Sequence, residues 1–173
     1  MRKRALICSL VALGAGVLVT VAAPVAAPLQ WTWHYSGAGI SASGTLTTND
    51  VADSAGYFQI IGITGLRNGV KIVGMQPTGT AIAGNEPYAV DNLIGPAGQQ
   101  LTDNGFGFAL ADGTFVNPFF AHNQTPSTYL EFFSSPYTAP GSAGPSHSEL
   151  PVSFGAALAE PAGAAASGGG HAR

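Results

Sequence analysis

The chain has 173 residues, of which 46% are hydrophobic and 9% are charged, with six basic and nine acidic side chains. A nucleic-acid partner needs a basic footprint, so we expect no nucleic-acid binding. Aromatic and aliphatic residues recur along the chain and can bury surface, so the low charge does not indicate disorder. The length fits one domain of ordinary size.

The first 27 residues have the pattern of a secretory signal peptide. Three cations at positions 2–4 precede an uncharged apolar run at 5–23, and small residues broken by prolines follow at 22–28. A positive head, an apolar run and a small-residue cleavage region together direct export, with cleavage expected within 22–28. A retained membrane anchor is the alternative, because the run is almost long enough to span a bilayer. We therefore expect membrane contact only through an uncleaved leader.

The exported part is predicted to hold one folded domain without disulfides. Cys8 is the only cysteine and lies in the apolar run, so stability must come from the core. Removal of the leader would leave three basic and nine acidic residues, a net charge of −6. The predicted organisation is a signal peptide at 1–27, a β-rich domain at 28–155, and a disordered tail rich in Ala and Gly at 156–173.

Alternation of apolar and polar residues predicts many short strands after a signal-peptide helix. The first strands are expected at 31–36 and 40–47, and Asn68-Gly69 predicts a two-residue hairpin between β-branched runs. Further strands are expected at 88–94, 106–110, 115–120, 129–133 and 149–154. Pro118 should end its strand or limit it to a sheet edge. The fold class is all-β, an antiparallel meander of eight or nine strands forming a sandwich or an up-and-down barrel.

Two sets of side chains are candidates for ligand binding. Trp31, Trp33 and Tyr35 share one face of a strand, where they would form an aromatic platform for a sugar or would pack in the core. The carboxylates are the second set, because loop carboxylates and amides provide the oxygen ligands that calcium takes. The alternative is turn formation, which the same residue types favour. The calcium candidates are Asp50, Asp53, Glu86 and Asp91.

No spacing in the sequence indicates a catalytic or transition-metal site. The four histidines lack the i, i+2 or i, i+4 spacing of paired metal ligands, and no Gly-x-Ser-x-Gly motif is present. The nearest approach to a triad is Ser134 or Ser135 with His122 and Glu131, which chance composition explains as well. We therefore predict a protein that is not an enzyme and has no required cofactor.

Three segments, in this order, resemble the ectodomains of PEP-CTERM proteins, the substrates of bacterial exosortases. They are Tyr-Ser-Gly-Ala-Gly-Ile-Ser-Ala-Ser-Gly-Thr-Leu-Thr-Thr at 35–48, Gly-Ile-Thr-Gly-Leu-Arg-Asn-Gly at 62–69 and Asn-Glu-Pro-Tyr-Ala-Val-Asp-Asn-Leu-Ile at 85–94. Tyr-Leu-Glu-Phe-Phe at 129–133 fits as well, and the resemblance covers nearly all of 29–154. Ala-Glu-Pro-Ala at 159–162 is similar to a remnant of the sorting signal, but no apolar helix follows it.

The resemblance implies a secreted β-rich protein of a Gram-negative bacterium, in the periplasm or at the cell surface, without the sorting helix. Proteins of this family accompany extracellular polysaccharide, which is therefore the expected partner. The sequence and the resemblance together predict a non-enzymatic protein of the cell surface or extracellular matrix. The first alternative is a β-domain that binds a carbohydrate or another small ligand, and the second is a hydrolase.

Overall fold

A computed structural model describes residues 27–134 and 147–160, which form nine strands and no helix. Accordingly, no helix in these two ranges has the length and apolar character needed to cross a membrane. The predicted signal peptide (except residue 27) and the tail from residue 161 lie outside the described residues. The strands are β1 (Leu29–Gly37), β2 (Ile40–Thr48), β3 (Phe58–Arg67), β4 (Val70–Met75), β5 (Leu93–Ile94), β6 (Phe108–Leu110), β7 (Phe115–Ala121), β8 (Thr128–Ser134) and β9 (Ser148–Leu158).

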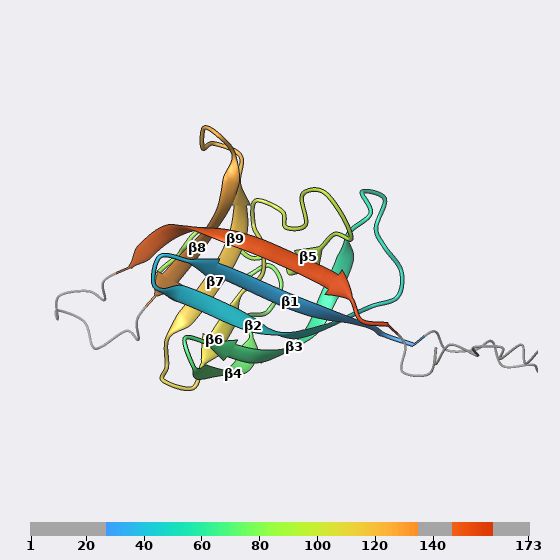
Figure 1. The fold of residues 1–173 in the computed structure, drawn as a ribbon, viewed down its shortest axis with the longest axis horizontal. Helices are drawn as coiled ribbons and strands as arrows, with labels where there is room; N and C mark the ends of the chain where they lie inside the picture. Colours follow the sequence, from blue (N-terminus) through green and yellow to red (C-terminus); the bar gives the residue numbers. More distant parts are fainter. Residues whose placement is uncertain (1–26, 135–146, 161–173) are drawn as a thin grey trace, which may run out of the picture.

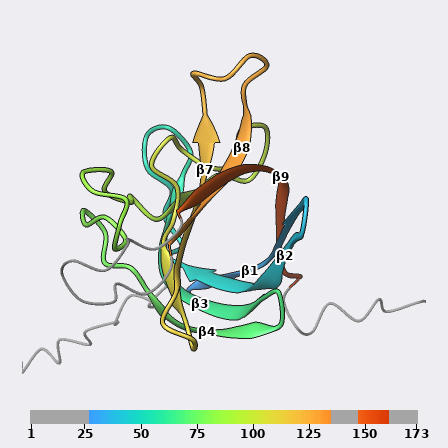
Figure 2. The same cartoon turned by 90° about the vertical axis from the view of Figure 1, so that its left-hand side faces the viewer.

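Eight of these strands close into an antiparallel barrel, which Figure 2 shows almost end-on. Around the ring the order is β1, β2, β3, β4, β6, β7, β8 and β9, and β9 pairs with β1 to close it. The short strand β5 pairs with β3 outside this order. The predicted all-β antiparallel fold is confirmed, and closure decides for a barrel over a sandwich. A closed ring leaves few unpaired strand edges for aggregation.

The seam between β1 and β9 joins the two ends of the described chain. Trp31 lies opposite Leu158, and the backbone N–H of Ala159 donates to the carbonyl of Gln30 over 2.8 Å. Strand β9 therefore runs beyond residue 155, where the change in composition predicts the end of the domain. Pairing with β1 orders these small residues although their own side chains bury little surface. The two ends leave the barrel side by side, on the right in Figure 1.

The predicted hairpin at Asn68-Gly69 is present between β3 and β4. Arg67 pairs with Val70, and the two turn residues have φ values of 46° and 81°, as a type I′ turn requires. The Asn68 side chain accepts from the N–H of Ser41 over 2.8 Å and donates to the carbonyl of Gly39 over 2.9 Å. The side chain therefore also links this turn to the turn between β1 and β2.

Strands β2 and β3 approach closely at a pair of glycines. Gly44 lies directly opposite Gly65 in the register of the two strands. A Cβ atom at Gly44 would overlap the carbonyl oxygen of Thr64, and one at Gly65 would overlap that of Ser43. Only glycine fits at this crossing, so the pair contributes to fixing the register of the barrel.

Aromatic side chains fill the barrel interior. Trp31, Trp33 and Tyr35 are only 1–2% exposed, and the ring of Trp33 lies 5.7 Å from that of Tyr35 and 5.8 Å from that of Phe106. These rings form the core, which is the alternative to a sugar platform that the sequence pattern left open. This corrects the hypothesis of a sugar platform, because none of the three rings has a free face at the surface. Burying them removes a large apolar area from water.

The segment between β4 and β6 forms an excursion outside the ring, on the left in Figure 2. The strand expected at 88–94 is reduced to β5 because Asn92 has a positive φ of 53°, which interrupts an extended conformation. The buried Asn92 side chain donates to the carbonyl of Gln76 over 2.8 Å and accepts from the N–H of Gly107 over 3.1 Å. It therefore joins both ends of the excursion.

Pro118 lies within β7 and pairs with Glu131, so the expectation that it ends its strand is wrong, whereas the alternative of an edge fits locally because β6 does not extend to Pro118. The structure shows why the sheet tolerates it. Strand β6 pairs only with the start of β7, and a loop replaces it farther along: the carbonyl of Pro118 accepts from Phe106 over 3.2 Å. Proline has no N–H to donate, and at this position no neighbouring strand requires such a donor.

Candidate functional site

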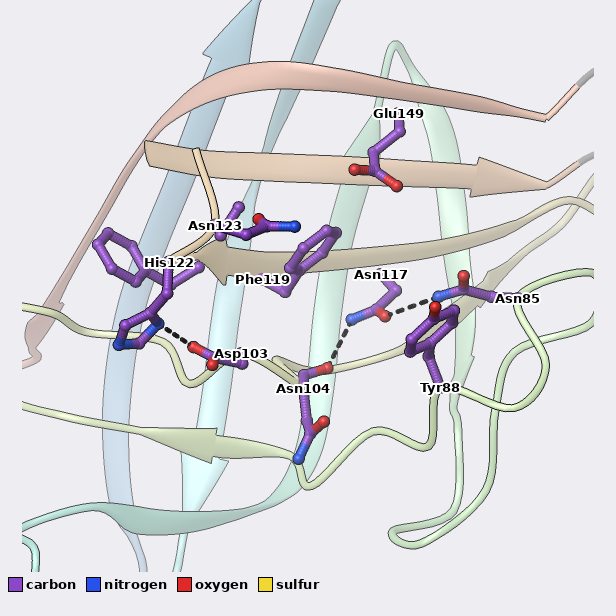
Figure 3. Close-up of a pocket in the computed structure, with 11 residues that line it drawn as sticks. Asn85, Tyr88, Asp103, Asn104, Asn117, Phe119, His122, Asn123 and Glu149 are labelled. Carbon is purple, nitrogen blue, oxygen red and sulfur yellow. Dashed lines mark hydrogen bonds and ion pairs between the residues drawn. The ribbon is translucent and has the colours of Figure 1, made fainter. Parts of the chain in front are cut away.

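A cleft of about 490 Å³ lies against the outer side of β7, between the excursion and β9 (Figure 3). Ligand sites are typically concave and combine apolar surface with a few polar groups, as this cleft does. The side chains that line it are Asn85, Tyr88, Asp103, Asn104, Asn117, Phe119, Phe120, Ala121, His122, Asn123 and Glu149.

Asn117 of β7 connects the barrel to the two loops that form the cleft wall. It is 3% exposed, and its Nδ2 donates to the carbonyls of Asn104 and Phe106 over 3.0 and 3.1 Å. Its Oδ1 accepts from Nδ2 of Asn85 over 3.2 Å. Because these partners satisfy the buried amide, Asn117 positions both loops and is a positioning residue of the cleft.

Tyr88 and Phe119 offer aromatic rings to the cleft. Tyr88 is 68% exposed and comes from the excursion, while Phe119 projects from β7 and is half-buried. Figure 3 shows Tyr88 at one end of the cleft and Phe119 near its centre. An exposed aromatic face offers a surface on which the C–H groups of a sugar ring can stack.

The opposite end of the cleft holds a contact between His122 Nδ1 and Asp103 Oδ1, which is an ion pair when His122 is protonated, and both side chains are more than half exposed. The edge of the Phe120 ring meets the imidazole at a centroid distance of 5.1 Å and an angle of 83°. Glu149 reaches the rim from β9. Among the residues that the structure describes, the lining includes no lysine or arginine.

The chemistry of this lining suits a polyhydroxylated ligand. Amide side chains donate and accept hydrogen bonds, and carboxylates accept them from hydroxyl groups. Charge-assisted hydrogen bonds to Asp103 and Glu149 would be stronger than those to neutral groups. The open form of the cleft leaves room for water-mediated contacts.

The chain was compared with known proteins at three levels. No protein-family model, no curated protein and no solved structure matches it. The resemblance to PEP-CTERM proteins therefore depends on the segments at 35–48, 62–69, 85–94 and 129–133 alone.

The four carboxylates predicted to hold calcium do not form a group of metal ligands in the structure. Asp53 accepts from the N–H groups of Ala55 and Tyr57, each over 2.9 Å, and Glu86 accepts from that of Gly84 over 3.0 Å. These are turn contacts, as the alternative interpretation expects.

Asp91 accepts from the hydroxyl of Thr102 over 2.6 Å, and Asp50 lies in the bend after β2. Burial raises the pKa of Asp91, while the Thr102 hydrogen bond opposes that shift. Across 27–134 and 147–160, no three His, Cys, Asp or Glu side chains are grouped as metal ligands. Calcium binding by these residues stays a prediction.

The barrel interior contains an ionic network away from the cleft. Glu131 is fully buried and accepts from the hydroxyl of Tyr35 over 2.6 Å and from the guanidinium of Arg67. Arg67 also lies 4.2 Å from the centre of the Phe133 ring, a cation–π contact. Burial, followed by the negative charge of Glu131, raises the pKa of Tyr35 well above its usual value.

The residues considered for a triad do not assemble. Glu131 faces the barrel interior, whereas His122 lies at the outer cleft and pairs with Asp103. Ser134 is buried on β8, and Ser135 lies outside the described residues.

Sequence reasoning did not single out Tyr88 or Phe119 as site residues. Tyr88 lies where a strand is expected, and Phe119 is in a run whose aromatic residues suggest core. The available signal was the Asn and Asp residues at 85–92 and 103–104, and of these segments only 85–92 holds residues predicted to bind calcium or form turns, Glu86 and Asp91. Their convergence with β7 depends on contacts between segments distant in sequence.

Proposed function

We propose that this chain is a non-enzymatic, exported β-barrel domain that binds carbohydrate in the cleft beside β7. The observation that carries the proposal is an accessible pair of aromatic rings, Tyr88 and Phe119, set among amide and carboxylate side chains. A role at the cell surface or in the extracellular matrix is supported by the export pattern at 1–27 and by the PEP-CTERM resemblance. Extracellular polysaccharide is accordingly the proposed partner.

Binding is tested by isothermal titration calorimetry of the purified protein with neutral tetrasaccharides of glucose, galactose and mannose. We expect at least one to bind at millimolar concentration. Phe119→Ala and Tyr88→Ala should each weaken binding about tenfold, as for loss of an aromatic anchor. Val73→Ala is the control, because Val73 is 59% exposed and does not line the cleft.

Two outcomes would count against this proposal. Equal binding by the cleft variants and the control would place the ligand elsewhere, and no binding of any tetrasaccharide would reject the carbohydrate assignment. The absence of catalysis is tested with panels of glycoside, ester and peptide substrates. Turnover that is lost in His122→Ala would replace the proposal with the hydrolase alternative.

A further inference from the structure

The cleft has an excess of negative charge. Its ionisable groups near neutral pH are Asp103, Glu149 and His122. When His122 is protonated the sum of their charges is −1, and when it is neutral the sum is −2. The cleft is therefore negative in both protonation states.

The surroundings of the cleft supply no compensating cation among the described residues. Arg67 and Lys71 are the only lysine or arginine residues in 27–134 and 147–160. Arg67 is paired with Glu131 inside the barrel, and Lys71 projects from the exposed side of β4. Asp91 adds a further negative group close by, since its Oδ2 contacts the side chain of Asn104.

The aromatic rings provide a second, independent preference for positive charge. The faces of Tyr88 and Phe119 carry the negative part of the ring quadrupole, which attracts an ammonium group. The cleft lining contains both aromatic rings and carboxylates, which are two kinds of contact for such a group. A uronate or sulfate group would meet like charge at Asp103 and Glu149 and would find no lysine or arginine among the described residues of the lining.

We propose that the cleft prefers glycans with free amino groups over neutral glycans and disfavours acidic ones. This inference rests on the proposed carbohydrate binding and specifies its ligand class. An ammonium group a few ångströms from a partly solvated carboxylate should improve affinity roughly fivefold to tenfold over the matching hydroxyl. The gain should decline as salt screens the charges, whereas binding of a neutral glycan should hardly change.

The test compares β-1,4-linked tetramers of glucose, glucosamine and glucuronic acid by calorimetry at about pH 6, where amino groups are charged. The glucosamine tetramer should bind roughly fivefold to tenfold more tightly than the glucose tetramer at low salt, and the glucuronic acid tetramer should bind least. Glu149→Gln should reduce the preference for the amino sugar. Glu160→Gln is the matched control, because it removes the same charge outside the cleft lining.

The outcomes separate this inference from the proposed function. Equal affinity for the glucose and glucosamine tetramers, with both lost in Tyr88→Ala, overturns the amino preference and leaves carbohydrate binding intact. Tightest binding of the glucuronic acid tetramer also overturns the preference. If Glu149→Gln and Glu160→Gln reduced the preference for glucosamine equally, the preference would come from the net charge of the protein. That result would reject the role of the cleft. No binding of any tetramer rejects both proposals.

Discussion

Arg67 forms a bidentate ion pair with Glu131 inside the barrel, with Nε and Nη2 donating to the two carboxylate oxygens over 3.0 and 2.5 Å. The Glu131 side chain is inaccessible to solvent and that of Arg67 is 11% exposed. Taking two charges out of water is costly, and their attraction offsets this only when the geometry is good. The pair therefore makes each partner dependent on the other.

Removing only Arg67 should strongly destabilise the protein. In Arg67→Met, Glu131 keeps the hydroxyl of Tyr35 but loses its counter-charge, at an expected cost of about 3–5 kcal/mol in the free energy of unfolding. Urea unfolding followed by far-UV circular dichroism measures this cost. The double variant Arg67→Met, Glu131→Leu should be more stable than Arg67→Met alone. If Arg67→Met lowered the free energy of unfolding by less than about 1 kcal/mol, the ion pair would contribute no more to stability than an exposed one does.

Stability should decline at alkaline pH because of Tyr35. Burial raises the pKa of its phenol well above the usual value of 10.0, so above that pH the unfolded chain releases a proton that the folded chain keeps. This proton release lowers the free energy of unfolding by up to about 1.4 kcal/mol per pH unit. Below about pH 10 the contribution of Tyr35 to stability is fully present. Urea unfolding at several pH values would detect the decline. Tyr35→Phe should have a shallower decline, and an identical slope would contradict the assignment.

The glycine crossing of β2 and β3 should tolerate no side chain. Gly44→Ala places a methyl group against the backbone of Thr64 and should lower the free energy of unfolding by about 3 kcal/mol or more. Gly74→Ala is a matched control, because a Cβ atom there meets nothing within 4 Å. Its effect should stay within about 1 kcal/mol. Similar unfolding midpoints for the two variants would show that the strands can separate without cost.

Both tryptophans should be shielded from solvent in the folded protein. Trp31 and Trp33 are 1% and 2% exposed, so acrylamide should quench their fluorescence weakly until the chain is unfolded in urea. Neither ring lines the cleft, so ligand binding there should leave the tryptophan emission nearly unchanged. Strong quenching in the absence of urea would show that the rings are accessible and would restore the sugar platform hypothesis.

Part of the candidate site was visible in the sequence, and part was not. Asn85, Asp103 and Asn104 belong to polar clusters that the sequence shows directly, and turn formation is a sufficient local reason for them. Their grouping around Asn117 is not local, because it needs hydrogen bonds between residues 13 and 32 positions apart. Tyr88 and Phe119 resemble strand and core residues until the excursion is placed beside β7.

The sequence by itself determined the all-β class and the Asn68-Gly69 hairpin. These features depend on short-range physics: side chains alternate across a strand every second residue, and Asn-Gly accepts the positive φ values of a tight turn. The inward direction of Trp31, Trp33 and Tyr35 follows from the same alternation once one face is buried.

Only the tertiary structure decided closure of the barrel, the burial of Glu131 and the position of the cleft. Strand β1 meets β9 across more than a hundred residues, and Glu131 meets Arg67 across 64. A charged residue in a predicted strand is expected to be exposed unless the partner strands are known. The register between distant strands determines which side chains meet, and it depends on packing of the whole barrel interior.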